Sequence, residues 1–177
     1  APRVRELERV CARHGLRYTA HGPLAANFMD PRLDALFRRA VAGYLDVCAT
    51  VGVTVLVLHA GVVPKRPQPE LDALHARERE ALRQLGDLAA RANVRLAVET
   101  LFTVAPDQYT AGPARLAREL DAVDHPHVIG CLDLSHAYLH CTAQGLDFDA
   151  EVERFGRVAG HVHIHDSFGE PETVRGF

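Results

Sequence analysis

Short apolar runs alternate along this chain with longer segments in which apolar residues recur at helical spacing. The short runs are rich in β-branched residues and predict strands, whereas the longer segments predict amphipathic helices. Five strands are predicted, at Tyr18–Ala20, Val53–Leu58, Leu96–Val98, Ile129–Leu132 and His161–His165. Because strands and helices alternate strictly, the pattern predicts an α/β fold with parallel strands.

Helices are predicted before the first strand and between successive strands. They cover a segment from Val4 that stops at Gly15, a segment from Met29-Asp30-Pro31 to Gly52, Glu70–Ala92, a segment from Gly112-Pro113 through Leu120, and one that Asp147 caps and that runs through Val158. Loops are predicted for the Pro-rich segment after His59, for Phe102–Thr110, and for the segment with His136 and His140. His14 and His75 fall on helices and are expected to be solvated, His140 is expected at the loop surface, and the charged positions of Glu70–Arg83 are expected on a solvated helix face.

Each predicted strand leads to a residue that commonly binds metals. These residues are His21, His59, Glu99, Asp133 and His163. Side chains at the same end of successive parallel strands converge, and in a (β/α)8 barrel they meet at the carboxyl-terminal mouth, where active sites lie. A small doubly wound sheet is the competing fold, but it would not usually place a ligand-type residue at every strand end. We therefore expect an incomplete (β/α)8 TIM barrel.

The 177 residues fit a single domain, residues 1–177. A complete barrel usually needs about 250 residues and has eight strands, of which five are visible here. An open barrel would also expose unpaired strand edges. We therefore expect a domain truncated at both ends, with one strand missing before Ala1 and two after Phe177.

Composition narrows the functional classes. A net charge of −3 gives no broad basic surface for nucleic acid. The four cysteines have no zinc-type spacing and, with no signal peptide in view, are expected to be free thiols of a cytoplasmic protein. No apolar stretch approaches the roughly 20 residues that cross a bilayer, so no membrane partner is expected.

Each candidate ligand, taken alone, could instead serve a purely structural role. Glu99 could pair with an arginine such as Arg95, and His21 and His59 could be hydrogen-bonded core histidines. Five such residues at five strand ends, however, favour a metal site over five independent structural roles.

Two further patterns add donors to this site. In Asp133-Leu-Ser-His136 a carboxylate and an imidazole can reach one centre from a short turn, and this donor pair suits Zn, Mn or Co. His161, His163 and His165 alternate with apolar residues and share one strand face. At most two of these three histidines can reach a metal at the barrel mouth.

The chain resembles the xylose-isomerase-like TIM-barrel superfamily, which holds sugar (phosphate) isomerases and epimerases and the endonuclease IV class of abasic-site nucleases (AP endonuclease family 2). The matching segments, in the order of the family, are His21-Gly-Pro-Leu-Ala-Ala-Asn27, Leu58-His59-Ala-Gly61, Ala97-Val-Glu99-Thr, Cys131-Leu-Asp133-Leu-Ser-His136 and His163-Ile-His165-Asp166-Ser167. Together they span nearly the whole chain.

The resemblance implies a divalent metal, Mn, Co, Mg or Zn, held in both branches by Glu99, Asp133 and His163. A nuclease-like member would hold up to three zinc ions and add as ligands His21, His59 and His136. An epimerase-like member would hold one ion and use Glu99 and His136 as catalytic residues. Residues expected to contact substrate are His21, His59, His165 and Asp166. Both patterns also require a Glu from the last strand, and the nuclease pattern an Asp-x-His, neither of which is found before Phe177.

We therefore expect a metal-dependent sugar (phosphate) isomerase or epimerase that transfers a proton through a metal-stabilised enediolate. One alternative is an endonuclease IV-like, zinc-dependent phosphodiesterase acting on abasic DNA, and the other is a non-catalytic binding member of the fold. The expected partner is a small sugar or polyol, with nucleic acid only under the nuclease alternative. A homo-oligomer is compatible with the sequence.

Overall fold

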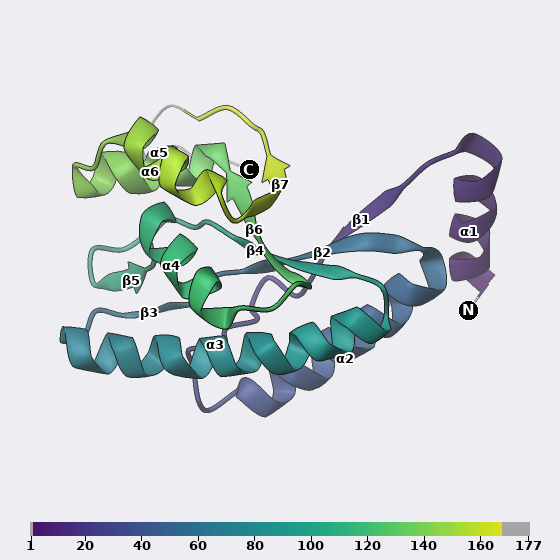
Figure 1. Cartoon of the computed structure of the whole chain (residues 1–177), viewed down its shortest axis with the longest axis horizontal. Coiled ribbons are helices and arrows are strands. Elements are labelled where there is room, and N and C mark those ends of the chain that lie inside the picture. Colours follow the sequence, from purple (N-terminus) through teal and green to yellow (C-terminus); the bar gives the residue numbers. More distant parts are fainter. Residues whose placement is uncertain (1, 168–177) are drawn as a thin grey trace.

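The computed structural model describes residues 2–167. Five parallel strands form one sheet in the order β1-β2-β4-β6-β7 (Figure 1). These strands are β1 (Tyr18–His21), β2 (Val53–His59), β4 (Arg95–Glu99), β6 (Val128–Asp133) and β7 (Ala159–His163). The helices are α1 (Pro2–His14), α2 (Asp34–Val51), α3 (Gln68–Arg91), α4 (Pro113–Val123), α5 (Leu134–Gln144) and α6 (Phe148–Gly156).

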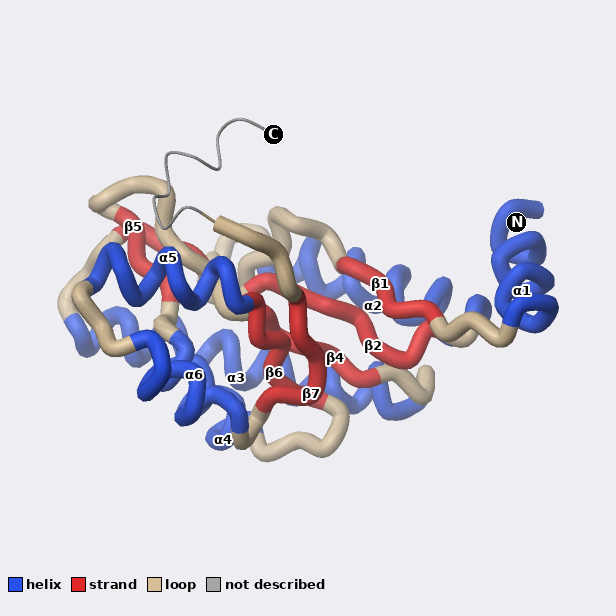
Figure 2. Tube along the Cα trace, turned by 90° about the horizontal axis from the view of Figure 1, so that it is seen from above, coloured by secondary structure: helices blue, strands red, loops and turns tan. Residues whose placement is uncertain are grey.

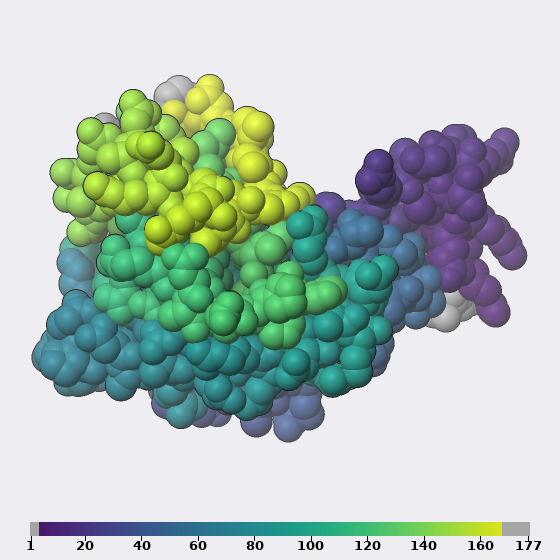
Figure 3. Space-filling model, viewed as in Figure 1, coloured from purple at the N-terminus to yellow at the C-terminus, as the bar shows by residue number. Residues whose placement is uncertain are grey.

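Strand order in the sheet follows strand order in the chain. A doubly wound sheet would reverse direction at a switch point, and this sheet does not. The strands instead curl into a half-barrel, which confirms the expectation of an incomplete TIM barrel. Figure 2 shows the strands at the centre of the molecule with the helices α2 to α6 around them. Helix α1 forms a separate lobe at the opposite end from α5 and α6 (Figure 3).

The two faces of the sheet belong to different apolar clusters, which explains why the strands are almost continuously apolar. Strand residues in the main core with the helices are Val53, Leu56, Leu58, Leu96, Val98, Val128 and Leu132. The inner face carries a smaller cluster of buried residues, made of Val55, Val57, Ala97 and Cys131. This alternation aims every second side chain of a strand into the interior of the half-barrel.

A small antiparallel sheet joins two segments for which the sequence predicts loops. Its strands are β3 (Val62–Pro64) and β5 (Gln108–Thr110), with Val62 opposite Thr110. Strands of three residues contain no measurable alternation, and the partners lie far apart in the sequence. Their pairing is therefore decided by the tertiary fold and not by a local pattern.

The loop prediction for the segment after Asp133 is also wrong, since this segment is helix α5. The Asp133 carboxylate accepts a hydrogen bond from the backbone N–H of His136 at 2.8 Å and caps the helix N-terminus. Two smaller corrections concern boundaries. Helix α2 begins at Asp34 after a turn at Pro31, and β7 ends at His163, before His165. The predicted cap of α6 is confirmed, because Asp147 accepts a hydrogen bond from the N–H of Ala150.

Two histidines expected at the surface are buried. His75 is fully buried because the β3–β5 sheet covers it, and its Nε2 lies 2.8 Å from the Tyr109 hydroxyl. His140 is buried on α5 against Gly112, where a Cβ would lie 2.6 Å from the ring nitrogen Nε2. Both corrections follow from elements that the sequence did not reveal.

The cysteines agree with the expectation of free thiols. All four cysteines are free thiols, and those at positions 48, 131 and 141 are buried. No helix in the described part of the chain combines the length and the apolar character needed to span a bilayer.

The contact between α6 and β6 predicts a large effect for Gly130→Ala. A Cβ at Gly130 would lie 2.5 Å from Cζ of Phe155 and 3.2 Å from the carbonyl oxygen of Val158. Because the Phe155 ring is fully buried and cannot yield, the substitution is expected to lower the free energy of unfolding by about 1–3 kcal/mol. Urea denaturation followed by circular dichroism measures this change.

The matched control is Gly43→Ala in α2, where a Cβ would meet no atom within 4 Å. There alanine is expected to raise the free energy of unfolding by about 0.5–1 kcal/mol, because it restricts the unfolded chain. An unchanged urea midpoint for Gly130→Ala would contradict the packing described for Phe155.

Candidate metal centre

One candidate ligand stands at the carboxyl end of each strand of the half-barrel. The last residues of β1, β2, β4, β6 and β7 are His21, His59, Glu99, Asp133 and His163. Register reinforces this alignment, because His59 is opposite Glu99 and Asp133 is opposite His163. The structure therefore brings together the residues that the strand-end pattern singled out.

Glu99 is the hub of the cluster, and its side chain is only 2% exposed. Its Oε2 lies 3.1 Å from Nε2 of His21 and 3.6 Å from Nε2 of His59. Its Oε1 lies 3.1 Å from Nδ1 of His163 and 3.4 Å from Nδ1 of His136. One buried carboxylate thus faces four imidazoles that come from four different parts of the chain.

Asp133 is equally buried and divides its two oxygens between two tasks. Oδ1 accepts the hydrogen bond that caps α5. Oδ2 faces the cluster and lies 3.0 Å from Nε2 of His165, 3.6 Å from Nδ1 of His136 and 3.7 Å from Nδ1 of His163. The cap fixes the orientation of the carboxylate, so its second oxygen is held toward the histidines.

Backbone carbonyls orient the imidazoles. Nδ1 of His21 lies 3.1 Å from the carbonyl oxygen of Gly22, and Nδ1 of His59 lies 3.1 Å from that of Leu24. A carbonyl at Nδ1 favours the tautomer that leaves Nε2 unprotonated, which is how many metal-binding histidines are held. In both residues Nε2 is the nitrogen that faces Glu99.

Thr100 is a supporting residue to which the sequence analysis assigned no role. It is fully buried, its hydroxyl donates to the carbonyl oxygen of Asp133, and it accepts a hydrogen bond from the N–H of Asp133 at 3.0 Å. Its own carbonyl oxygen lies 3.1 Å from Nδ1 of His136. Thr100 therefore fastens the ends of β4 and β6 to each other directly behind the cluster. In the sequence, only the position of Thr100 directly after Glu99 could have indicated this role.

The charges around Glu99 keep it ionised. Burial alone raises the pKa of Glu99, but the hydrogen bond with His136 and the charges of His163 and His59 lower that pKa to about 2. Burial lowers the pKa of His59 despite the nearby Glu99 carboxylate. Burial also acts to lower the pKa of His136, but its hydrogen bond to Glu99 and the charge of Asp133 raise it overall.

The donor set fits a divalent cation. Among the side chains that the structure describes, neither Glu99 nor Asp133 pairs with a lysine or an arginine, and their charged partners are histidines. Buried carboxylates without a permanent cation are costly, and a bound metal would compensate them. Ligand atoms within 4.8 Å of one another form the groups Glu99–Asp133–His163, His21–His59–Glu99 and Asp133–His136–His165.

The two remaining predicted residues differ in their placement. His165 reaches the cluster through Asp133, although its side chain is 51% exposed. Asp166 is exposed, and its carboxylate accepts a hydrogen bond from the N–H of Ser167, so the contacts described for it belong to the loop.

A buried carboxylate on α3 holds the segment that follows His59. Oε1 of Glu78 accepts a hydrogen bond from the N–H of Gly61 at 2.8 Å, and the hydroxyl of Thr110 donates to the carbonyl oxygen of Gly61 at 2.9 Å. Glu78 was expected on a solvated helix face but is 3% exposed. Its Oε2 lies 3.4 Å from Nδ1 of the buried His75 on the same helix.

Replacing Glu78 by Ala is expected to lower the free energy of unfolding by about 1–3 kcal/mol, because a buried N–H at Gly61 loses its acceptor. Hydrogen exchange at the Gly61 amide should become faster, which locates the effect beside His59. Glu80→Ala on the exposed side of the same helix is the matched control, with a change within about 0.5 kcal/mol. Equal losses in both variants would argue against this role of Glu78.

Comparison with known proteins agrees with this architecture. A family model described as xylose isomerase-like TIM barrel matches residues 1–176. No curated protein matches the sequence. Three of the similar solved structures are a D-tagatose 3-epimerase-like protein, a 3-keto-D-glucoside 4-epimerase from E. coli, and an AP endonuclease, family 2, from Brucella melitensis.

The first of these is 16% identical with a TM-score of 0.78, and the match covers 96% of this chain and 64% of that one. The second is 22% identical with a TM-score of 0.72, covering 92% and 64%. The third is 18% identical with a TM-score of 0.71, covering 90% and 62%. At these identities the likeness establishes the fold, and this chain spans less than two thirds of the length of each structure.

Proposed function

This chain belongs to the xylose isomerase-like TIM-barrel family, and from that premise we propose that it is a metal-dependent isomerase or epimerase of a small sugar or polyol. The observation that carries the proposal is the convergence of Glu99, Asp133 and His163, whose ligand atoms lie within 4.8 Å of one another. They stand at the carboxyl ends of three neighbouring strands, where catalytic residues of such barrels lie. The epimerases among the similar structures support this choice of reaction.

Glu99 is the candidate for moving the proton. Its carboxylate is ionised, so it can accept a proton from the carbon next to a substrate carbonyl. When bound, a divalent cation would polarise that carbonyl and acidify the carbon, so that a carboxylate, which is a weak base, could remove the proton. A bound substrate would exclude water from Glu99. This desolvation raises the pKa of Glu99 and makes it a stronger base.

His136 is the candidate for orienting a substrate hydroxyl. Its Nδ1 is engaged by Glu99 at 3.4 Å and by the Thr100 carbonyl at 3.1 Å, so its Nε2 is the nitrogen left for substrate. The rings of Phe102 and His165 flank it with centroids 5.1 and 5.5 Å away. These contacts hold the imidazole in one orientation, as a positioning group requires.

Solvent exchange tests the proposal with a panel of substrates of the expected class. The full-length gene product is loaded with Mn²⁺ or Co²⁺ and incubated in D₂O with several ketoses, including D-fructose, D-psicose and D-tagatose. Proton NMR is expected to report metal-dependent loss of the proton next to the carbonyl and the appearance of an epimer or an aldose. Retention of all carbon-bound protons across the panel would overturn the assignment of this substrate class.

A specific observation favours a second candidate, the zinc-dependent cleavage of abasic DNA. Two further ligand groups, His21–His59–Glu99 and Asp133–His136–His165, adjoin the first, as a cluster of several metals requires. The net charge of −3 argues weakly against DNA as the substrate. Close to three zinc ions per chain together with incision of an abasic oligonucleotide would establish this second function. The absence of both metal binding and turnover would favour a binding role for the fold.

A further inference from the structure

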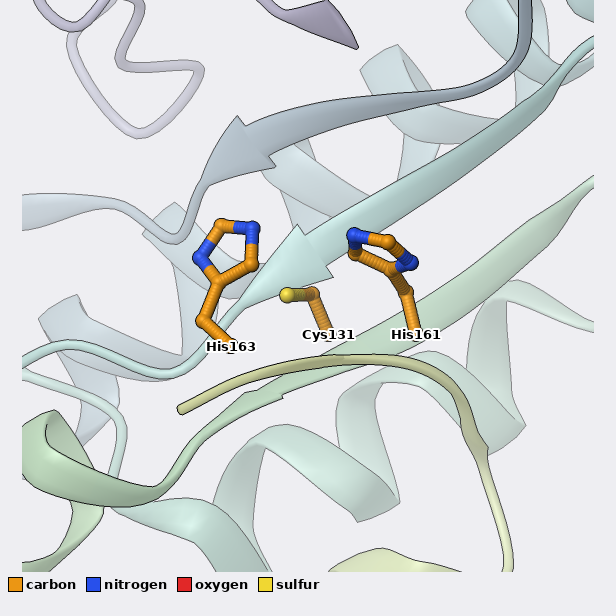
Figure 4. Close-up of side chains that lie close together, drawn as sticks. All are labelled: Cys131, His161 and His163. Carbon is orange, nitrogen blue, oxygen red and sulfur yellow. The ribbon is translucent and has the colours of Figure 1, made fainter. Parts of the chain in front are cut away.

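A second group of metal-binding side chains lies inside the half-barrel, below the cluster of Glu99 and Asp133. It consists of Cys131, His161 and His163, and Figure 4 shows the thiol between the two imidazole rings. One ligand atom from each residue lies within 4.8 Å of the others. The group belongs to β6 and β7, two strands that are paired directly.

Strand geometry explains why these three side chains meet. Cys131 precedes Asp133 by two residues on β6, and His161 precedes His163 by two residues on β7. Residues two apart on a strand point to the same face, so Cys131 and His161 face the interior one level below the strand ends. Register places Cys131 opposite His161, and the rings of His161 and His163 are 5.3 Å apart at their centroids.

We propose that Cys131, His161 and His163 bind a zinc ion at a site distinct from the one that holds the catalytic metal. A thiolate and two imidazoles form a softer donor set than the carboxylate-rich cluster above, and this set suits Zn²⁺. Nδ1 of His163 faces Glu99 at 3.1 Å, so the zinc site takes Nε2 of the same ring. Binding displaces the thiol proton of Cys131 to solvent and leaves the sulfur as a thiolate ligand. When the cluster above also holds its cation through Nδ1 of His163, the ring N–H proton leaves to solvent as well, and the imidazolate bridges the two ions.

The surroundings of Cys131 are apolar on the inner face of the sheet. Cys131 is fully buried and belongs to the inner apolar cluster with Val55, Val57 and Ala97. An apolar wall limits access of water and strengthens the attraction between thiolate and cation. Within the described part of the chain, neither Cys48 nor Cys141 joins a group of possible ligands, although both are buried. Among the three buried cysteines described, Cys131 alone lies beside other possible metal ligands.

A structural role follows from the position of the site. β7 is the last strand of the sheet described here and its residues are half-buried or exposed, whereas five of the six residues of β6 are buried. A zinc ion held by one residue of β6 and two of β7 would fasten these two paired strands to each other. It would also fix the ring of His163, which the catalytic cluster shares.

Cobalt substitution tests this site by a signal that oxygen and nitrogen ligands do not give. The full-length protein with Co²⁺ is expected to show a thiolate-to-cobalt charge-transfer band in the near ultraviolet, which added Zn²⁺ removes. Cys131→Ser should abolish the band, whereas Cys141→Ser, which replaces another buried cysteine, should retain it. A missing band in the wild type, or a band that survives Cys131→Ser, would overturn the proposal.

Two further variants separate this zinc site from the catalytic cluster. His161→Gln changes a half-buried side chain outside the catalytic cluster, so the zinc site can still be tested if Cys131→Ser does not fold. The affinity for Co²⁺, measured from the intensity of the charge-transfer band, should fall at least about tenfold in this variant. Glu99→Gln removes the hub of the catalytic cluster and should leave the band in place. Loss of the band in Glu99→Gln together with its retention in His161→Gln would refute the second site. These cobalt measurements do not depend on the result of the exchange assay with ketoses.

Discussion

Substitution of Glu99 by Gln is expected to remove the catalytic metal and the activity together. The amide keeps the shape of the side chain but takes away the negative charge that four imidazoles face. Even outer-shell partners of metal ligands cost about 10–100-fold in affinity or activity when they are replaced, so the loss for this central ligand should exceed about 100-fold. Isothermal titration with Mn²⁺ measures the affinity, and deuterium exchange from a ketose substrate measures turnover.

A buried carboxylate elsewhere in the chain provides the control. Glu119 on α4 is buried, pairs with Arg79 and Arg115, and joins no group of possible ligands among the described residues. Glu119→Gln should lower stability, because two arginines lose their partner, and should leave Mn²⁺ affinity unchanged. If both variants lose the metal equally, the effect on Glu99 reflects the fold as a whole, and our assignment of the hub is wrong.

Substitution of Asp133 by Asn is expected to abolish metal retention and activity with little loss of stability. Asn is as good a helix N-cap as Asp, so the hydrogen bond to the N–H of His136 and the start of α5 should survive. The oxygen that faces His165 and His163 would lose its charge. Elemental analysis after gel filtration gives the metal content, and thermal unfolding gives the stability.

Asp133→Ala and Asp147→Ala separate the two tasks of this carboxylate. Asp133→Ala should lose the metal and, in addition, about 0.5–2 kcal/mol from the missing cap. Asp147 caps α6 in the same way but joins no ligand group among the described residues, so Asp147→Ala should lose the cap energy alone. Unchanged metal content in Asp133→Asn would refute the site that we assign to the strand ends.

Much of the candidate site followed from local pattern. An apolar run of strand length fixes where a strand ends, and parallel strands with helical connections bring those ends to one edge. His21, His59, Glu99, Asp133 and His163 could therefore be grouped from their positions in the sequence, and the structure places them together. No long-range contact had to be predicted for this grouping, because both the strand ends and the direction of each strand are local properties.

The contacts that hold the site were not accessible in this way. Thr100 joins Asp133 to β4, and Glu78 holds Gly61, in each case through pairings between residues distant in the sequence. The β3–β5 sheet arises from two segments of three residues that carry no periodic signal. The sequence pattern indicates Asp133 as a ligand but does not indicate its second task as the cap of α5.

The sequence by itself determined the class of fold and the set of residues at the strand ends, because apolar periodicity and side-chain chemistry can be recognised within a short segment of the chain. Only the tertiary structure decided which oxygen of Asp133 faces the histidines, why His75 and His140 are buried, and that Cys131 meets His161 inside the half-barrel. These features depend on strand register and on the packing of helices over the sheet. Register and packing result from contacts across the whole chain, which no local window of residues contains.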